Sequence, residues 1–310
     1  MKARIPAGMF LVSAASLMYE ISLARLLAIE LWHHYAFLII SCALLGYGAA
    51  GAFRLTWTER IPLFLPVLSF SLLLIPLFLL SSQLPFDPAL MSLDPWHGGW
   101  LLLNFLLLAV PFFLAGLTLN LLLEQYTEHV HFLYACDLVG ASCGILLFFI
   151  FVPHLVETEL LGISALLAAV SCLCLASGKK QNTAVIMISL ALILGWFGLE
   201  KIKFRISDYK ELPLALRYPQ SRLLETQRDA SVRIDTLETP MARFAPGLSL
   251  KYRGTIPNQH GLTLDGDRFT GMSPLIPESL GTYLRYLPEC ILFFEQSLPD
   301  NVLIMNTIGA

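Results

Sequence analysis

The stretch WLLLNFLLLAVPFFLAGLTLNLLL, residues 100–123, decides the fold class, because it runs for 24 residues without a charged side chain. About 20 apolar residues in a helix cross the roughly 30 Å of hydrocarbon in a bilayer. A helix satisfies its own backbone hydrogen bonds, which lipid cannot do. Residues 100–123 therefore predict a transmembrane helix.

The same length criterion predicts about seven apolar helices, and hence a polytopic α-helical membrane bundle. The predicted spans are 6–31, 36–53, 61–80, 100–123, 132–153, 158–177 and 183–199. The first span has the alternative of a signal peptide, since Lys2 and Arg4 precede it. Glu20 and Arg25 interrupt that stretch and further spans follow, so we expect a retained helix.

Composition divides the chain into two parts that suit different solvents. The chain is 56% hydrophobic and 14% charged with a mean hydropathy of +0.68, whereas a soluble domain is about 25% charged. Residues 1–199 hold 17 of the 43 charged residues, and residues 200–310 hold 26. We expect a transmembrane domain over 1–199, with the lipid bilayer as its partner, and a water-facing, β-rich segment over 200–300. The net charge of −3 and the lack of a long basic run argue against a nucleic-acid partner.

Basic residues near the helix ends predict a cytoplasmic amino terminus. The location expected for this multi-pass chain is the cell (inner) membrane. The candidate cytoplasmic markers are Lys2, Arg4, Arg54, Arg60, Lys179 and Lys180. Seven crossings would place the polar part outside, whereas Lys201, Lys203 and Arg205 argue that it is inside. Either 183–199 lies in the interface or re-enters, or an earlier segment does not cross. The sequence leaves six to eight spans open.

Strand and turn signals mark the polar part. Residues 231–238 (SVRIDTLE) alternate imperfectly, as a half-buried strand would. Residues 262–264 lead into Asp265-Gly266, a hairpin-turn dipeptide. A helical stretch is expected around 277–297, and a buried strand over 302–305.

Three charges inside predicted spans are the candidate functional residues, namely Glu20, Arg25 and Asp137. An ionised group at mid-bilayer costs at least about 2.5 kcal/mol and must face a partner or water. Glu20 and Arg25 are separated by about 140° around the helix axis, so we expect their partners on other helices. One reading is a proton or substrate relay, and the other is a structural contact, or for Asp137 a place near the membrane surface.

Other motifs favour packing or loops over chemistry. Residues 46–51 (GYGAAG) match a dinucleotide-binding pattern, but inside a predicted span they indicate helix packing, as do Gly140 and Gly144. His129 and His131 lie near two glutamates without a further well-spaced ligand set, so no metal site is expected. Five of the six cysteines lie in apolar runs with no C-x-x-C pair, which favours helix packing over disulfides or zinc.

Several stretches together resemble the membrane-embedded relatives of spermidine synthase. In the membrane part these are residues 17–20 (LMYE), 41–48 (SCALLGYG) and 134–141 (YACDLVGA). In the polar part they are 209–216 (YKELPLAL), 243–250 (RFAPGLSL) and 264–267 (LDGD). The resemblance implies a membrane bundle fused to an aminopropyltransferase-like, Rossmann-type transferase domain, preceded by a small β-rich domain over 200–300.

The resemblance also implies a cofactor site. Residues 301–310 would be the first strand and glycine turn of an incomplete Rossmann-like domain, which in the family holds S-adenosylmethionine or its decarboxylated form. Only Gly309 is available there as a cofactor-binding residue. The family's Tyr-Gln pair corresponds here to Ser231-Val232, and its Tyr-His pair to Tyr283-Leu284. The catalytic residues stay unknown, and we expect this chain by itself to be inactive.

Two other classes of function stay open. One is a transporter or lipid-handling protein in which Glu20, Arg25 and Asp137 line a path through the bundle. The other is a membrane protein that binds a soluble partner or a second copy of itself through unidentified surfaces.

Overall fold

The structure is a computed structural model that describes residues 3–57, 59–87, 90–91, 93–176, 178, 181, 183, 185–186, 206–273 and 281–288. The chain divides into two compact units, Met1–Arg205 and Ile206–Ala310, and each is described here by itself.

The described part of the first unit contains six helices that are long and apolar enough to cross a membrane. They are α1 (Arg4–Glu30), α2 (Ala36–Thr56), α3 (Phe64–Ser82), α4 (Trp96–Gln125), α5 (Val130–Phe151) and α6 (Glu157–Leu175). Short 3-10 turns, η1 (His33–Tyr35) and η3 (Thr127–His129), precede α2 and α5. At six of the predicted spans the structure thus has a helix of sufficient length and apolar composition, which is compatible with a multi-pass membrane protein. The predicted span 183–199 lies outside the described residues, apart from isolated positions.

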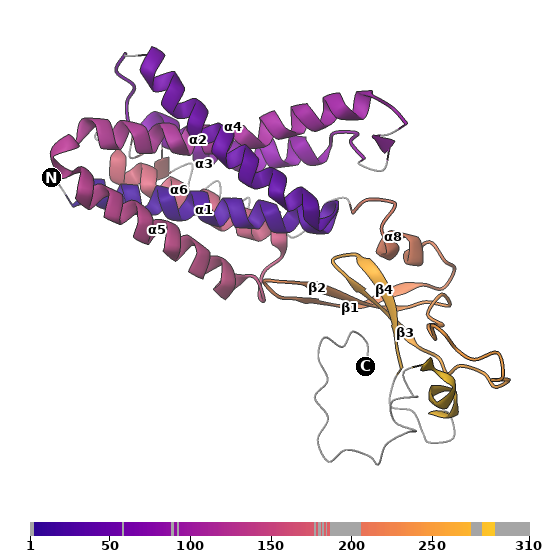
Figure 1. The fold of residues 1–310 in the computed structure, drawn as a ribbon. Coiled ribbons are helices and arrows are strands. Elements are labelled where there is room, and N and C mark those ends of the chain that lie inside the picture. Colours follow the sequence, from indigo (N-terminus) through magenta and orange to yellow (C-terminus); the bar gives the residue numbers. More distant parts are fainter. Residues whose placement is uncertain are drawn as a thin grey trace. The chain divides into compact units, whose positions relative to one another are not determined.

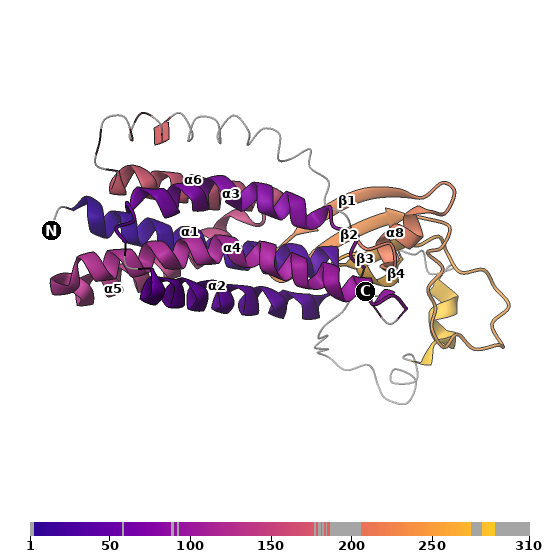
Figure 2. The same ribbon diagram turned by 90° about the horizontal axis from the view of Figure 1, so that it is seen from above.

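Helix α1 is the centre of the bundle. Its most extensive contacts are with α5 and α6, and it also packs on α2 and α4. Helices α3 and α6 lie on one side of α1, and α2 on the other (Figures 1 and 2). Helices α2 and α5 keep most of their surface outside the bundle, with large apolar side chains such as Phe37, Leu44, Leu138 and Phe149 exposed. These are the surfaces that lipid would cover.

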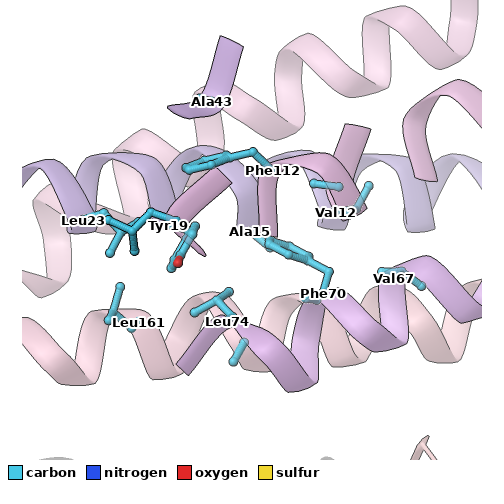
Figure 3. Close-up of a cluster of buried hydrophobic side chains, with 14 of the residues drawn as sticks. Val12, Ala15, Tyr19, Leu23, Ala43, Val67, Phe70, Leu74, Phe112 and Leu161 are labelled. Atoms are coloured by element: carbon cyan, nitrogen blue, oxygen red, sulfur yellow. The ribbon is translucent and has the colours of Figure 1, made fainter. Parts of the chain in front are cut away.

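The core of the bundle is built around Tyr19 of α1 (Figure 3). Its ring lies edge-on to Phe70 of α3, with centroids 6.3 Å apart, and tilted against Phe112 of α4 at 5.4 Å. Leu74 and Leu161 complete this fully buried cluster. One layer of side chains therefore ties together four helices.

Glycines set the closest helix crossings. A Cβ at Gly140 would collide with the carbonyl oxygen of Phe10, and one at Gly144 with that of Ala14, so α1 and α5 meet backbone to backbone. Gly46 is pressed in the same way against the α4 backbone at Ala109 and Phe113. The expected packing role of these three glycines is confirmed, because small residues let helices approach closely in lipid.

Hydrogen bonds from small side chains to neighbouring helices add to this packing. Ser171 of α6 donates to the Gly8 carbonyl at 2.7 Å, and Ser71 of α3 to the Ala165 carbonyl at 2.9 Å. The thiol of Cys42 lies 3.5 Å from the Phe105 carbonyl, and that of Cys172 lies 3.5 Å from the Phe64 carbonyl. The cysteines thus pack as expected and also serve as weak interhelical donors.

The described part of the second unit is a four-stranded antiparallel sheet with strand order β1-β2-β3-β4. The strands are β1 (Arg222–Arg228), β2 (Arg233–Glu238), β3 (His260–Leu264) and β4 (Asp267–Met272). The predicted hairpin turn is confirmed, since Asp265 (φ 51°) and Gly266 (φ 73°) adopt the left-handed conformation that such turns need.

Two elements of this unit were not predicted, β1 and the short helix α8 (Glu211–Leu216). Leu212 and Ala215 of α8 pack on Leu237 of β2. The strand predicted over 231–238 begins at Arg233. Of the helix predicted around 277–297, the described part is a 3-10 helix, η4 (Gly281–Tyr286), and the strand predicted over 302–305 lies outside the described residues.

Candidate functional site

A line of polar side chains inside the membrane bundle is the candidate functional site. It consists of Ser13, Ser16 and Glu20 on α1, Tyr47 on α2 and Asp137 on α5, and we call it the polar seam. Ser13, Ser16 and Glu20 recur at intervals of three and four residues, so they share one face of α1. The seam therefore follows the side of α1 that meets both α2 and α5.

Asp137 is held by α1. Its Oδ1 accepts a hydrogen bond from the Ser13 hydroxyl at 2.5 Å, and its side chain is half-buried. The Ser13 hydroxyl also lies 2.9 Å from the Met9 carbonyl, so its single proton has two acceptors. The close α1–α5 crossing at Gly140 brings this carboxylate within reach of Ser13.

Tyr47 is the contribution of α2. Its hydroxyl shares a hydrogen bond of 2.7 Å with the Ser16 hydroxyl, and either oxygen can donate. The Tyr47 ring packs closely against Gly116 of α4, where an added Cβ would lie 2.7 Å from the ring. Tyr47 therefore meets α1 at Ser16, one turn from Ser13, which holds Asp137.

Glu20 is half-buried, and no hydrogen bond from another described residue reaches its carboxylate. Arg25 is 8% exposed and lies beyond Glu20 on α1. Because it is turned by about 140° from Glu20, it does not share the face of the seam. Of the three charged residues singled out by sequence, the structure brings Glu20 and Asp137 to one seam and leaves Arg25 outside it.

The other sequence candidates show no such convergence. His129 and His131 are exposed, and no group of three or more metal-ligating side chains exists among the described residues. Tyr283 is buried, and its hydroxyl bonds to the Ser273 hydroxyl at 3.0 Å, as a packing residue would. Gly309 and Cys290 lie outside the described residues. The 46–51 motif lies within the continuous helix α2, so it lacks the strand and turn that bind dinucleotides. The packing role expected for the whole motif holds for Gly46 only, since Gly48 and Gly51 have open space around them.

Ser13, Ser16 and Tyr47 were missed by sequence reasoning. The signal that could have found the two serines is their spacing from Glu20 on one helical face. Tyr47 carries no such signal, because its place beside Ser16 depends on the α1–α2 packing. Chemically, the seam offers carboxylate and hydroxyl oxygens, which can bind a cation or pass a proton.

Comparison with known proteins finds no matching family model, no matching curated protein and no matching solved structure.

Proposed function

We propose that this chain is the membrane part and the following β-rich domain of a membrane-tethered, aminopropyltransferase-like or methyltransferase-like protein. The observation that supports this best is the antiparallel four-stranded sheet over 222–272, which follows a bundle of six apolar helices. It lies in the segment where the sequence resemblance calls for a small β-rich domain. The resemblance of residues 243–250 and 264–267 points to the same segment.

Catalysis in such a protein requires an adenosyl ligand held by a Rossmann-like domain. In the described residues no side chains of that kind are assembled, and Gly309 is the only expected ligand-binding residue. The chain of 310 residues is therefore proposed to anchor and position a transferase domain rather than to turn over substrate alone.

The proposal is tested by adenosyl-ligand binding, measured by calorimetry on the purified chain in detergent. If the reading frame continues past residue 310, the matched sample is the protein extended to its natural stop codon. We expect saturable binding of S-adenosylmethionine or its decarboxylated form by the longer protein only. An absence of binding in both samples would refute the proposed ancestry.

A second function is favoured by the polar seam. In this alternative the bundle itself moves protons or a small cation, with Glu20 and Asp137 as the titrating groups and Tyr47 between them. Proton flux into proteoliposomes would be measured for Glu20→Gln and Asp137→Asn. Ser142→Ala is the matched control, since Ser142 lies on the exposed side of α5 and bonds only to the Leu138 carbonyl of its own helix. Loss of flux in both seam variants, and not in the control, would support transport. Equal flux in all three variants would refute the transport function.

A further inference from the structure

One end of the bundle carries a cleft that is separate from the polar seam. It has a volume of about 1090 Å³ and is lined by the amino ends of α1 and α3 and the carboxyl ends of α2, α4 and α6. Arg4, Arg54 and Arg60 line it together with one acidic residue, Glu124. We call it the arginine cleft.

The one acidic residue of the lining is neutralised within the cleft. Arg54 grips Glu124 with two hydrogen bonds, from Nε at 2.8 Å and from Nη2 at 2.9 Å. Its remaining nitrogen, Nη1, donates to the carbonyls of Trp57 at 2.5 Å and Glu59 at 3.1 Å. Each nitrogen of the Arg54 guanidinium is therefore already hydrogen-bonded within the bundle. The positive charge that remains for a ligand of the cleft belongs to Arg4 and Arg60.

Arg4 and Arg60 have donors to spare. Arg4 gives one nitrogen, Nη2, to the Leu173 carbonyl at 3.0 Å, which leaves the other donors of its guanidinium. Arg60 is exposed at the mouth of the cleft and makes no hydrogen bond or ion pair with another described residue. A guanidinium presents its donors in a planar fork that matches the oxygens of a phosphate.

Part of the wall of the cleft is apolar. Ile5, Ile61, Leu63, Phe64, Leu121 and Leu175 contribute it, beside polar side chains such as Gln125 and Gln181. Cationic groups next to an apolar part of the wall, at the end of a bundle of apolar helices, have the chemistry of a phospholipid site. A free phosphate ion would contact the arginines and leave the apolar part of the wall exposed to water.

We propose that the arginine cleft binds a phosphate group, and that the phosphate belongs to an anionic phospholipid whose acyl chain lies along the apolar part of the wall. Arg60 and Arg4 contact the phosphate, and Arg54 positions the rim by holding Glu124 and the carbonyls of Trp57 and Glu59. This site is independent of the proposed transferase and of the polar seam.

The test measures lipid retention by native mass spectrometry of the full chain, loaded with phosphatidylglycerol or with phosphatidylcholine. Attraction near the surface is about 1 kcal/mol per arginine, which converts to about fivefold in affinity for each. We expect phosphatidylglycerol to be retained preferentially, Arg60→Gln to lower that preference about fivefold, and Arg60→Lys to keep most of it. Arg222→Gln, at an exposed position of strand β1, is the matched control and should leave retention unchanged.

Two further measurements distinguish a lipid phosphate from a free phosphate ion and show whether the Arg60→Gln variant is folded. Millimolar inorganic phosphate that displaces the lipid would identify a free phosphate site, whereas unchanged lipid retention supports the lipid. Arg60 has no partner to lose among the described residues, so Arg60→Gln should melt like the parent chain. Equal retention of the two lipids, or equal retention by the parent and Arg60→Gln, would overturn the proposal.

Discussion

The Ser13 hydroxyl donates to the Asp137 carboxylate at 2.5 Å, which joins α1 to α5 by a side-chain hydrogen bond within the polar seam. Ser13→Ala would leave this carboxylate without its donor. Interhelical hydrogen bonds in membrane proteins contribute about 0.6 kcal/mol on average and up to about 1.7. We expect Ser13→Ala to lower the free energy of unfolding by that amount in detergent-based denaturation.

The double variant Ser13→Ala with Asp137→Leu is the control for this pair. Replacing both partners by apolar groups removes the unmet acceptor together with the donor, so the double variant should recover most of the lost stability. If the two effects simply add, the hydrogen bond contributes nothing to the bundle.

The α1–α5 crossing should not tolerate a methyl group at Gly144. A Cβ there would collide with the Ala14 carbonyl, and overpacking of this kind costs about 1–3 kcal/mol. Gly51→Ala in α2 is the matched control, because its added Cβ would have no heavy atom within 4 Å apart from the adjoining backbone of its own helix. Thermal unfolding in detergent should therefore shift downward for Gly144→Ala and stay unchanged or rise for Gly51→Ala.

Tyr19 and Tyr47 should respond in opposite directions to replacement by phenylalanine. The Tyr19 hydroxyl is buried and finds no hydrogen-bond partner among the described residues, whereas Tyr47 bonds to Ser16. Tyr19→Phe removes an unmet polar group while keeping the ring against Phe70 and Phe112, so it should stabilise the bundle by about 1 kcal/mol. Tyr47→Phe should destabilise it by about as much. A loss of stability in Tyr19→Phe would show that the Tyr19 hydroxyl does form a stabilising interaction.

The hairpin between β3 and β4 holds a second matched pair of substitutions. Gly266 (φ 73°) adopts the left-handed conformation without strain, because it has no Cβ. Arg268 (φ 51°) adopts the same conformation although its Cβ makes it unfavourable. That conformation costs a non-glycine residue about 1–2 kcal/mol. Amide hydrogen exchange in β3 and β4 should speed up in Gly266→Ala and slow down in Arg268→Gly. Faster exchange in Arg268→Gly would show that its side chain holds the strand.

Length and composition alone predicted the six described spans, because the hydrocarbon thickness fixes how long such helices must be. The hairpin at Asp265-Gly266 was equally readable, since few dipeptides adopt two left-handed residues in succession. Strand β1 was missed because its sequence, RLLETQR, does not alternate between apolar and polar residues. In the structure none of its side chains is fully buried. Helix α8 is only six residues long and depends on packing against Leu237.

The polar seam could be predicted only in part. Glu20 and Asp137 are costly in lipid wherever they lie, so the sequence alone singles them out. The helix that faces each of these carboxylates is decided by close crossings, such as that of Gly140 in α5 against Phe10 in α1. A single sequence does not reveal which helices cross. Arg25 was singled out by the same cost in lipid, and its separation of about 140° from Glu20 could already be predicted from helix geometry.

The central position of α1 constrains how the protein is made. This helix is synthesised first, yet its most extensive contacts are with α5 and α6, which leave the ribosome last of the six. Until then Glu20 and Arg25 must sit in a helix that has no finished bundle to shield them. A nascent chain that ends after α4 therefore presents a first helix whose charges at Glu20 and Arg25 lack the contacts that α1 makes with residues 130–175 in the finished bundle.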